Sequence, residues 1–330
     1  MLKNENRIFE IKSEDDFQNL ALEIFMFQAT QNIVYKEWLN HLKININEIN
    51  SYEQIPFLPI SFFKSKQVVT GHLSSKAFTF TSSSTTSQIP AKHYVNTIDL
   101  YMQSYTKSFN LFYGDVSNYA ILALLPNYLQ RQGSSLVYMV NDLINRSQNQ
   151  HSGFYLDNVL DLKQKIERLK RENQKVILIG VTYALLDLCE LNVELNDQFI
   201  VMETGGMKGR RKEMIKEELH HILKKGFKIE NIHSEYGMTE LLSQAYSKGD
   251  GLYDAPPWMR FLIRDIDDPL QMQKNAKTGG INVIDLANIY SCSFIATQDL
   301  GKIEKTGQLA LMGRFDHSDV RGCNLMIAGL

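Results

Sequence analysis

Residues 176–203 read VILIGVTYALLDLCELNVELNDQFIVME, and this stretch indicates the fold most clearly. Its two ends, Val176 to Val181 and Phe199 to Glu203, are short apolar runs typical of buried strands. Between them, Tyr183 to Leu191 has the length and composition of a helix. Strands that alternate with helices in this way predict a parallel sheet with helices packed against it.

The same alternation continues on both sides of this stretch. Upstream, Tyr119 to Leu125 is another apolar run, and downstream Arg211 to Lys225 has the charge-rich composition of a surface helix. We expect Gly226 to stop that helix, because glycine commonly ends helices. Further elements are expected at Phe17 to Leu42 (helical), Lys76 to Thr81 (strand) and Lys163 to Glu172 (helix).

The pattern changes from about Leu241 onward, where short apolar runs are split by Gly, Asp and Pro. Such runs predict a β-rich final third. We therefore expect an α/β protein in two parts: a helix-covered, mostly parallel sheet in residues 1–237 and a β-rich subdomain in residues 238–330. A chain of 330 residues is long enough for this division.

The composition excludes several classes of protein. With 44% hydrophobic and 22% charged residues, the chain is neither disordered nor collagen-like. Its net charge of -2 provides no global basic field for nucleic acid. The most apolar stretch, Val176 to Leu186, is shorter than the ~20 residues that cross a membrane. The three cysteines form no CxxC pair and the N-terminus has no signal-peptide pattern, so we expect a cytoplasmic protein.

A hydroxyl-rich loop follows the strand expected at Lys76 to Thr81. Its hydroxyls and backbone N–H groups offer many hydrogen-bond donors in a small space, which suits a polyphosphate. Runs of Ser and Thr are also common in surface turns, so a loop without a ligand is the alternative. The candidate phosphate-binding residues are Ser82, Ser83, Ser84, Thr85, Thr86 and Ser87.

A glycine pair, Gly205 and Gly206, lies between the strand that ends at Glu203 and the next expected helix. Glycines at the carboxyl end of a parallel strand let a flat ring approach the backbone, at the edge where α/β sheets usually bind ligands. The pair is therefore a candidate adenine site. A bare turn that begins a helix is the alternative.

The motif Glu235-Tyr-Gly-Met-Thr-Glu-Leu241 places an aromatic ring, a hydroxyl and a carboxylate close together. Tyr236 can stack on a purine, and Thr239 can bond a phosphate. Glu240 can hold a divalent cation beside that phosphate. A generic turn with an exposed glutamate is the alternative.

Two turns in the β-rich region add a further carboxylate and a guanidinium. Asp299 lies in Thr297-Gln-Asp-Leu-Gly301, and Arg314 lies in Gly313-Arg-Phe-Asp316. Asp299 can accept hydrogen bonds from both hydroxyls of a ribose, and Arg314 can donate to a ribose or a phosphate.

In chain order these motifs resemble those of adenylate-forming enzymes, whose phosphate loop is typically SSGTTG and is followed by YGxTE, TGDLG and GRxD. Within that superfamily the chain is most similar to the acyl-protein synthetases of bacterial luminescence, and more distantly to phenylacetate-CoA ligases. The resemblance covers most of the chain from Ile55 onward. Further residues that carry it are Ile55-Pro-Phe-Leu-Pro59, Phe63-Lys64, Leu125-Pro126, Arg131-Gln-Gly-Ser-Ser135 and the run from Gly313 to Cys323.

The resemblance implies the N-terminal domain of an adenylate-forming enzyme, without the mobile C-terminal domain. It also implies a reaction in which a carboxylic acid, a fatty acid in this family, attacks the α-phosphate of ATP with the help of Mg²⁺. The products are an acyl-adenylate and pyrophosphate. The implied roles are phosphate binding by the loop Ser82 to Ser87, adenine contact by Gly205, Gly206 and Tyr236, α-phosphate contact by Thr239, Mg²⁺ coordination by Glu240, and ribose binding by Asp299 and Arg314.

A second implied step passes the acyl group to a cysteine near the C-terminus and then to a partner, an acyl-acceptor protein or a reductase. Cys323 lies in the corresponding tail beside Arg321, whose guanidinium would favour the nucleophilic thiolate. A small buried residue in a final strand is the alternative for Cys323. Cys189 and Cys292 are expected to be structural.

Ser84 and Ser87 depart from the family loop, which has glycine at both positions. If either position requires a positive φ, a serine there destabilises the loop by ~1 kcal/mol and brings a side chain toward the phosphates. The alternative function is therefore a catalytically weakened relative that binds an acyl chain, a nucleotide or a partner protein without turnover.

Overall fold

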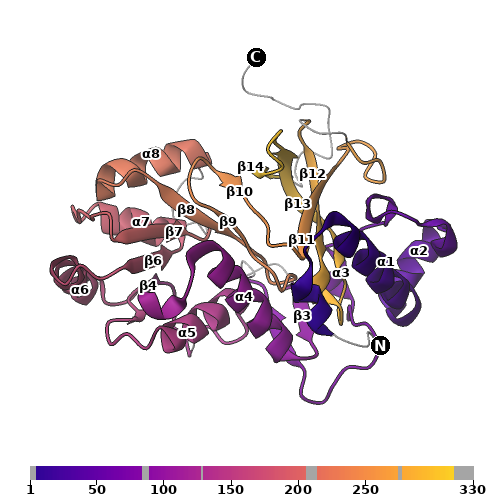
Figure 1. The fold of residues 1–330 in the computed structure, drawn as a ribbon, viewed down its shortest axis with the longest axis horizontal. Helices are drawn as coiled ribbons and strands as arrows, with labels where there is room; N and C mark the ends of the chain where they lie inside the picture. Colours follow the sequence, from indigo (N-terminus) through magenta and orange to yellow (C-terminus); the bar gives the residue numbers. More distant parts are fainter. Residues whose placement is uncertain (1–4, 84–88, 128, 206–213, 274–276, 316–330) are drawn as a thin grey trace.

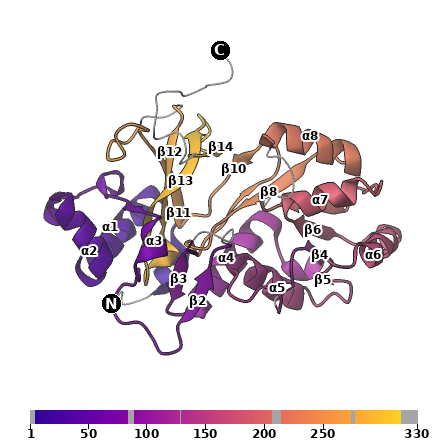
Figure 2. The ribbon, with the colours of Figure 1, turned by 180° about the vertical axis from the view of Figure 1, so that it is seen from behind.

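The computed structural model describes residues 5–83, 89–127, 129–205, 214–273 and 277–315. Within these residues it contains two six-stranded sheets and a two-stranded hairpin, with helices packed against both larger sheets. Figure 1 shows the two larger sheets as separate lobes, and Figure 2 shows the same lobes from behind. The predicted α/β class is confirmed.

The first sheet has the strand order β5–β4–β6–β7–β8–β9, and β9 alone among its described strands runs antiparallel to its neighbour. Every residue of β4 and β6 is buried, as expected for strands that helices cover on both faces. The prediction drawn from residues 176–203 is therefore confirmed. The strands are Ala120–Leu124 (β4), Gly153–Phe154 (β5), Val176–Gly180 (β6), Phe199–Glu203 (β7), Ile232–Tyr236 (β8) and Ala245–Ser247 (β9).

Helices cover both faces of this sheet. Figure 1 shows α4 and α5 below it and α7 and α8 above it, with α6 at the far end. No helix in the described ranges combines the length and the apolar character that a bilayer-spanning segment needs. The helices are Ile98–Tyr113 (α4), Ser135–Ser147 (α5), Val159–Arg171 (α6), Thr182–Cys189 (α7) and Lys216–Phe227 (α8).

The prediction that Gly226 ends a helix is wrong. Helix α8 continues through Gly226 to Phe227 and ends at Lys228, which has a left-handed backbone (φ 56). A Cβ atom at Gly226 would lie 2.6 Å from the Sγ atom of Cys189 on α7. Glycine is needed here because the two helices pack closely, and not because the chain turns.

The second sheet is β-rich, as predicted for the final third. Its order is β10–β14–β13–β12–β11, with the short β1 paired to β13. Strand β1 thus joins this sheet from the first part of the chain, and β9 joins the first sheet from the last part, so a division near residue 237 stays a proposal. The strands are Leu58–Pro59 (β1), Leu252–Tyr253 (β10), Met259–Arg264 (β11), Gly279–Asp285 (β12), Phe294–Ile303 (β13) and Leu309–Arg314 (β14).

The N-terminal helices α1 (Glu14–Gln31) and α2 (Ile33–His41) lie against the outer side of the second sheet (Figure 1). Asn32 separates them, because its side chain accepts a hydrogen bond from the backbone N–H of Tyr35 and so begins the second helix. The remaining elements are Phe62–Ser65 (α3), the hairpin Phe78–Thr81 (β2) and Lys92–Val95 (β3), and the 3-10 turns Glu5–Glu10, Ile46–Glu48, Tyr52–Gln54, Val116–Asn118 and Leu286–Asn288 (η1 to η5).

Candidate active site

The carboxyl ends of three neighbouring parallel strands lie at one edge of the first sheet. The register pairs Gly180 of β6 with Glu203 of β7, and Glu203 with Ser234 of β8. Gly205 and Tyr236, which follow the last two of these positions, therefore lie at the same edge. Open α/β sheets usually bind their ligands at such an edge.

Asp299 connects this edge to the second sheet. Its Oδ2 atom accepts a hydrogen bond from the Tyr236 hydroxyl (2.9 Å), and its Oδ1 atom accepts one from Nε of Arg314 (2.8 Å). The negative charge of Asp299 raises the pKa of the Arg314 guanidinium. Each carboxylate oxygen has two acceptor positions, and the bonds from described residues leave one position on each oxygen for a ligand hydroxyl. Three residues predicted from separate motifs thus meet at one point.

The ring of Tyr236 is 5% exposed and has aromatic neighbours. It makes edge contacts with Tyr253 (ring centroids 5.9 Å apart) and with Phe261 (5.6 Å). These contacts and the bond to Asp299 fix its orientation. Contact between this ring and an adenine stays a prediction.

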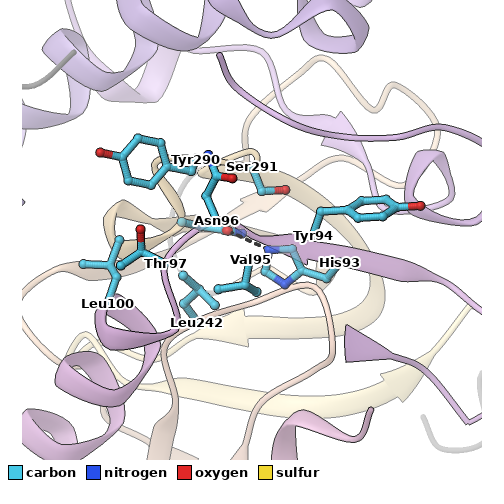
Figure 3. Close-up of a pocket in the computed structure, with 10 residues that line it drawn as sticks. His93, Tyr94, Val95, Asn96, Thr97, Leu100, Leu242, Tyr290 and Ser291 are labelled. Atoms are coloured by element: carbon cyan, nitrogen blue, oxygen red, sulfur yellow. Dashed lines mark hydrogen bonds between the residues drawn. The ribbon is translucent and has the colours of Figure 1, made fainter. Parts of the chain in front are cut away.

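His93 connects the end of the hydroxyl-rich loop to the Thr239–Glu240 turn. Its Nδ1 atom lies 2.8 Å from the carbonyl oxygen of Thr239, and its Nε2 atom lies 2.9 Å from Oδ1 of Asn288. Figure 3 shows the His93 ring on its short strand beside Tyr94 and Val95. The Asn288 amide donates in turn to the carbonyl oxygen of Glu240 (2.8 Å). Burial lowers the pKa of His93 to about 4, so the ring is neutral at pH 7 and its single N–H can donate to only one of the Thr239 and Asn288 oxygens. His93 therefore lies against the carbonyl group of Thr239, and the Asn288 amide bonds to the next carbonyl group of the turn.

Glu240 offers a carboxylate suited to Mg²⁺. It is 7% exposed, burial raises its pKa, and it forms no ion pair with any described residue. Among the described residues no group of three or more His, Cys, Asp or Glu is placed to hold a metal. Mg²⁺ is commonly held by one or two carboxylates together with substrate phosphates, and a single buried carboxylate fits that mode.

A buried ion pair anchors the backbone of the glycine turn. Oε2 of Glu203 accepts a hydrogen bond from the N–H of Gly205 (2.8 Å), which has a positive φ of 69. Lys216 on α8 pairs with the other oxygen of Glu203 and donates to the Tyr253 hydroxyl (2.5 Å). Burial alone would raise the pKa of Glu203, but hydrogen bonding by His220 and the charge of Lys216 lower it to about 2.

The structure describes the hydroxyl-rich loop only in part, and two other predicted positions lie outside the described residues. Ser82 follows β2, and its hydroxyl accepts a hydrogen bond from the N–H of Ala91 (2.8 Å), which closes the base of the loop. Ser83 is exposed and lies outside the strand. Roles for both stay predictions. The predicted residues that lie outside the described ranges are Ser84, Thr85, Thr86, Ser87, Gly206 and Cys323.

Cys189 and Cys292 are both buried, and burial raises the pKa of each thiol to about 12. Thiols with such values are protonated at pH 7 and poor nucleophiles. Their environments support the structural roles expected for them.

The motifs did not single out a role for His93, Glu203 or Lys216. His93 follows the hydroxyl-rich loop within a short strand, and that position was a usable signal. Glu203 ends a parallel strand, where ligand-proximal side chains are common. Lys216 gave no signal, because it lies 13 residues from Glu203 and meets it only through the packing of α8 on the sheet.

A family model described as acyl-protein synthetase, LuxE, matches residues 8–329. Among solved structures, ATP-bound MatB from Rhodopseudomonas palustris has a TM-score of 0.54 and 16% identity, over 72% of this chain and 47% of that chain. An open conformation of 2-hydroxyisobutyryl-CoA ligase, in complex with 2-HIB-AMP and CoA, has a TM-score of 0.65 and 11% identity, over 92% of this chain and 70% of that chain. No curated protein matches the sequence.

These likenesses establish the fold. The luciferase-like enzyme from the nonluminescent Zophobas morio mealworm adds a TM-score of 0.52 at 15% identity, over 75% of this chain and 60% of that one. The chain spans about half the length of the MatB chain, 47% of it. The adenylate-forming fold that the motifs predict is confirmed.

Proposed function

Because the chain belongs to the acyl-protein synthetase (LuxE) family, we propose that it activates a carboxylic acid with ATP, as an acyl-adenylate. The observation that carries this proposal is the meeting of Tyr236, Asp299 and Arg314 at the carboxyl edge of the first sheet. Asp299 keeps acceptor positions for the two ribose hydroxyls. The glycine turn at Gly205 lies at the same edge and would contact the adenine.

In this reaction an oxygen of the substrate carboxylate attacks the α-phosphorus of ATP. A new O–P bond forms, and the bond between that phosphorus and the bridging oxygen breaks to release pyrophosphate. The Thr239 hydroxyl would donate to the α-phosphate, and Ser82 to Ser87 would donate to the outer phosphates. Glu240 would hold Mg²⁺, which supplies charge neutralisation for the phosphates when bound.

A small apolar void of about 10 Å³ lies among side chains of the first sheet and of helices α4 and α5. It is too small to hold an aliphatic chain, so the proposal of a fatty acid rests on what the family resemblance implies. The residues that line the void include Phe109, Met139, Val140, Ile179, Met202 and Tyr246.

The test is exchange of labelled pyrophosphate into ATP with a panel of fatty and aryl acids. We expect acid-dependent exchange that falls at least 100-fold in Glu240→Gln, because the Mg²⁺ carboxylate is lost. Glu304→Gln is the matched control, since Glu304 forms an ion pair with Lys302, away from the proposed site. Exchange that is absent with every acid, or unchanged in Glu240→Gln, would contradict the proposal.

We also propose that the acyl group moves from the adenylate to Cys323 and then to a partner, an acyl-acceptor protein or a reductase. The thiolate would attack the acyl carbonyl, so that a C–S bond forms and AMP leaves. A free reactive thiol fits the reducing cytoplasm that we propose for the protein. Cys323→Ala should lose a hydroxylamine-labile acyl label and keep pyrophosphate exchange, whereas Cys189→Ala should keep both. A label that persists in Cys323→Ala would contradict this step.

The second candidate function is binding without turnover. It is favoured by Ser84 and Ser87, which stand where the family loop has glycine. If it is correct, the native chain shows no exchange, and the double variant Ser84→Gly, Ser87→Gly restores it. Exchange by the native chain would exclude this candidate.

A further inference from the structure

Strand β8 presents Glu235 to the face of the sheet opposite the one that bears Ser234. Register pairs Glu235 with Tyr246 of β9, and side chains directly opposite in an antiparallel pair share a face. The Tyr246 ring contacts the rings of Phe112 and Tyr113 on α4. Glu235 therefore lies on the α4 face, the same face as the small apolar void.

Glu235 and Gln244 converge over Gly237, two residues before Thr239. A Cβ atom at Gly237 would collide with Oε1 of Glu235 and would lie 3.4 Å from Cγ of Gln244. The two side chains thus occupy the space that a side chain at position 237 would fill. This places two polar groups beside Gly237, at the start of the segment that leads into the Thr239–Glu240 turn.

Gln244 has an unpaired polar atom within the described part of the protein. Gln244 is 4% exposed, and its Oε1 atom has no hydrogen-bond partner. Glu235 forms no ion pair with a described residue, in contrast to Glu203 on the neighbouring strand. Buried polar atoms in native proteins are nearly always paired, so an unpaired acceptor beside a proposed reaction centre points to a ligand.

Glu235 is uncharged at neutral pH. Burial raises its pKa to about 8, and the negative charge of Glu203 across the sheet adds to that effect. Lys216 lowers the value, but it lies on the opposite face and is paired with Glu203. The other titratable groups around Glu235 are all uncharged at pH 7: Tyr101 and Tyr113 on α4, Tyr246 on β9, and His233 on β8.

We propose that Glu235 and Gln244 bind a hydroxyl or amide N–H group of the acid substrate, close to its carboxyl group; this inference rests on the proposed function. Oε1 of Gln244 requires a donor, and a neutral carboxyl group can both donate and accept. The substrate class is therefore an acid that carries a hydroxyl or amide N–H donor near its carboxyl group.

The test compares octanoate, 3-hydroxyoctanoate and N-hexanoylglycine in the pyrophosphate exchange assay with the full chain. We expect kcat/KM for at least one of the two donor-bearing acids to exceed that for octanoate by roughly tenfold or more. Gln244→Leu should abolish this preference and leave KM for ATP unchanged. Glu235→Gln should keep it, since the amide also donates and accepts. Gln174→Leu is the control, because Gln174 lies at the opposite edge of the sheet and bonds to Asn118.

The outcomes separate the inference from the proposed function. Equal use of octanoate by the native chain overturns the inference and leaves the proposed function intact. A higher KM for ATP in Gln244→Leu, with the acid preference unchanged, also overturns it, because the adenine amine would then be the donor. If no acid supports exchange, the proposed function fails, and the inference is then tested by the thermal stabilisation that each of the three acids gives. A donor-bearing acid that stabilises the native chain more than it stabilises Gln244→Leu supports the site. Equal stabilisation of the two proteins overturns it.

Discussion

The two faces of strand β8 carry polar clusters that differ in how completely their members are paired. On the face toward α8, Glu203 of the neighbouring strand is paired with Lys216 and also accepts from the backbone of Gly205. On the face toward α4, Glu235 and Gln244 lie together with a carboxamide oxygen unpaired. The pKa values of these two carboxyl groups on adjacent strands are thus shifted in opposite directions, to about 2 for Glu203 and about 8 for Glu235.

The difference shows that partners, and not burial alone, set the charge of a buried carboxyl group. Burial is the largest single influence on the pKa of both residues, and in both it acts to raise the value. Only Glu203 has a cation and several donors to offset it. We infer that the paired cluster stabilises the glycine turn, whereas the unpaired cluster is completed by a ligand. Two predictions test this contrast and two test the proposed ATP site between the sheets, beginning with the largest effect.

Removal of the cation from the paired cluster should give the largest loss of stability. Lys216→Met leaves the Glu203 carboxylate buried without its main partner, so the free energy of unfolding should fall by about 3 kcal/mol. Urea denaturation measures this. Lys228→Met is the control, because its partner Glu194 is exposed and the pair should contribute less than about 1 kcal/mol. Equal losses in the two variants would contradict the contrast.

Removal of the carboxylate that joins the two sheets should affect ATP binding next. Asp299→Ala loses the acceptor for the ribose hydroxyls and leaves the Tyr236 hydroxyl unpaired, so KM for ATP should rise about 30-fold, or ~2 kcal/mol. KM for the acid should change little. The exposed Asp267→Ala serves as control. An unchanged KM for ATP in Asp299→Ala would show that the ribose binds elsewhere.

The unpaired cluster should give the chain a pH-dependent stability. The unfolded chain releases the Glu235 proton near 4.5, whereas the folded chain keeps it to about 8, so Glu235 lowers stability as pH rises between these values. Glu235→Gln should therefore gain roughly 1 to 2 kcal/mol over the native chain between pH 5 and pH 8, less than the full shift because the side chain is partly exposed.

The paired cluster predicts the opposite sign. Because the pKa of Glu203 is lowered, its stabilising contribution is present above pH 4.5 and is lost as pH falls toward 2. Guanidinium denaturation of the native chain and Glu235→Gln across the pH range measures both slopes. Identical slopes for the two proteins between pH 5 and pH 8 would show that Glu235 is ionised in the folded state.

The smallest effect is expected for the hydroxyl between the two sheets. Tyr236→Phe keeps the ring contacts with Tyr253 and Phe261 and removes the hydroxyl that bonds to Asp299. KM for ATP should rise about fivefold, or ~1 kcal/mol, because Asp299 loses one of two orienting donors. Tyr183→Phe, on α7, is the control. A change as large as that in Asp299→Ala would mean that the Tyr236 hydroxyl itself contacts ATP.

Much of the fold could be predicted from local patterns in the sequence. The parallel sheet was predicted from the apolar runs at β6 and β7 and from the helix between them. This was possible because a strand buried on both faces must be apolar along its whole length. The role of Gly226 could not be read in this way. Its reason is a contact with Cys189, which lies 37 residues earlier and meets it only when two helices pack.

The site was predictable where a motif carries its own chemistry. Tyr236, Asp299 and Arg314 were identified from short motifs, but their bonds to one another join different sheets. The contrast between Glu203 and Glu235 was not predictable, since it depends on which face each side chain takes. That choice is set by the pairing of β8 with β7 and β9, and no local pattern specifies the partner residues.

The most direct test of this account is a crystal structure with a non-hydrolysable acyl-adenylate analogue that carries a 3-hydroxyoctanoyl group. We predict that its ribose hydroxyls contact the Asp299 carboxylate and that its acyl chain enters on the α4 face of β8. Its 3-hydroxyl group should lie within hydrogen-bond distance of Gln244 and Glu235. An acyl chain on the α8 face, or a ribose away from Asp299, would contradict the account.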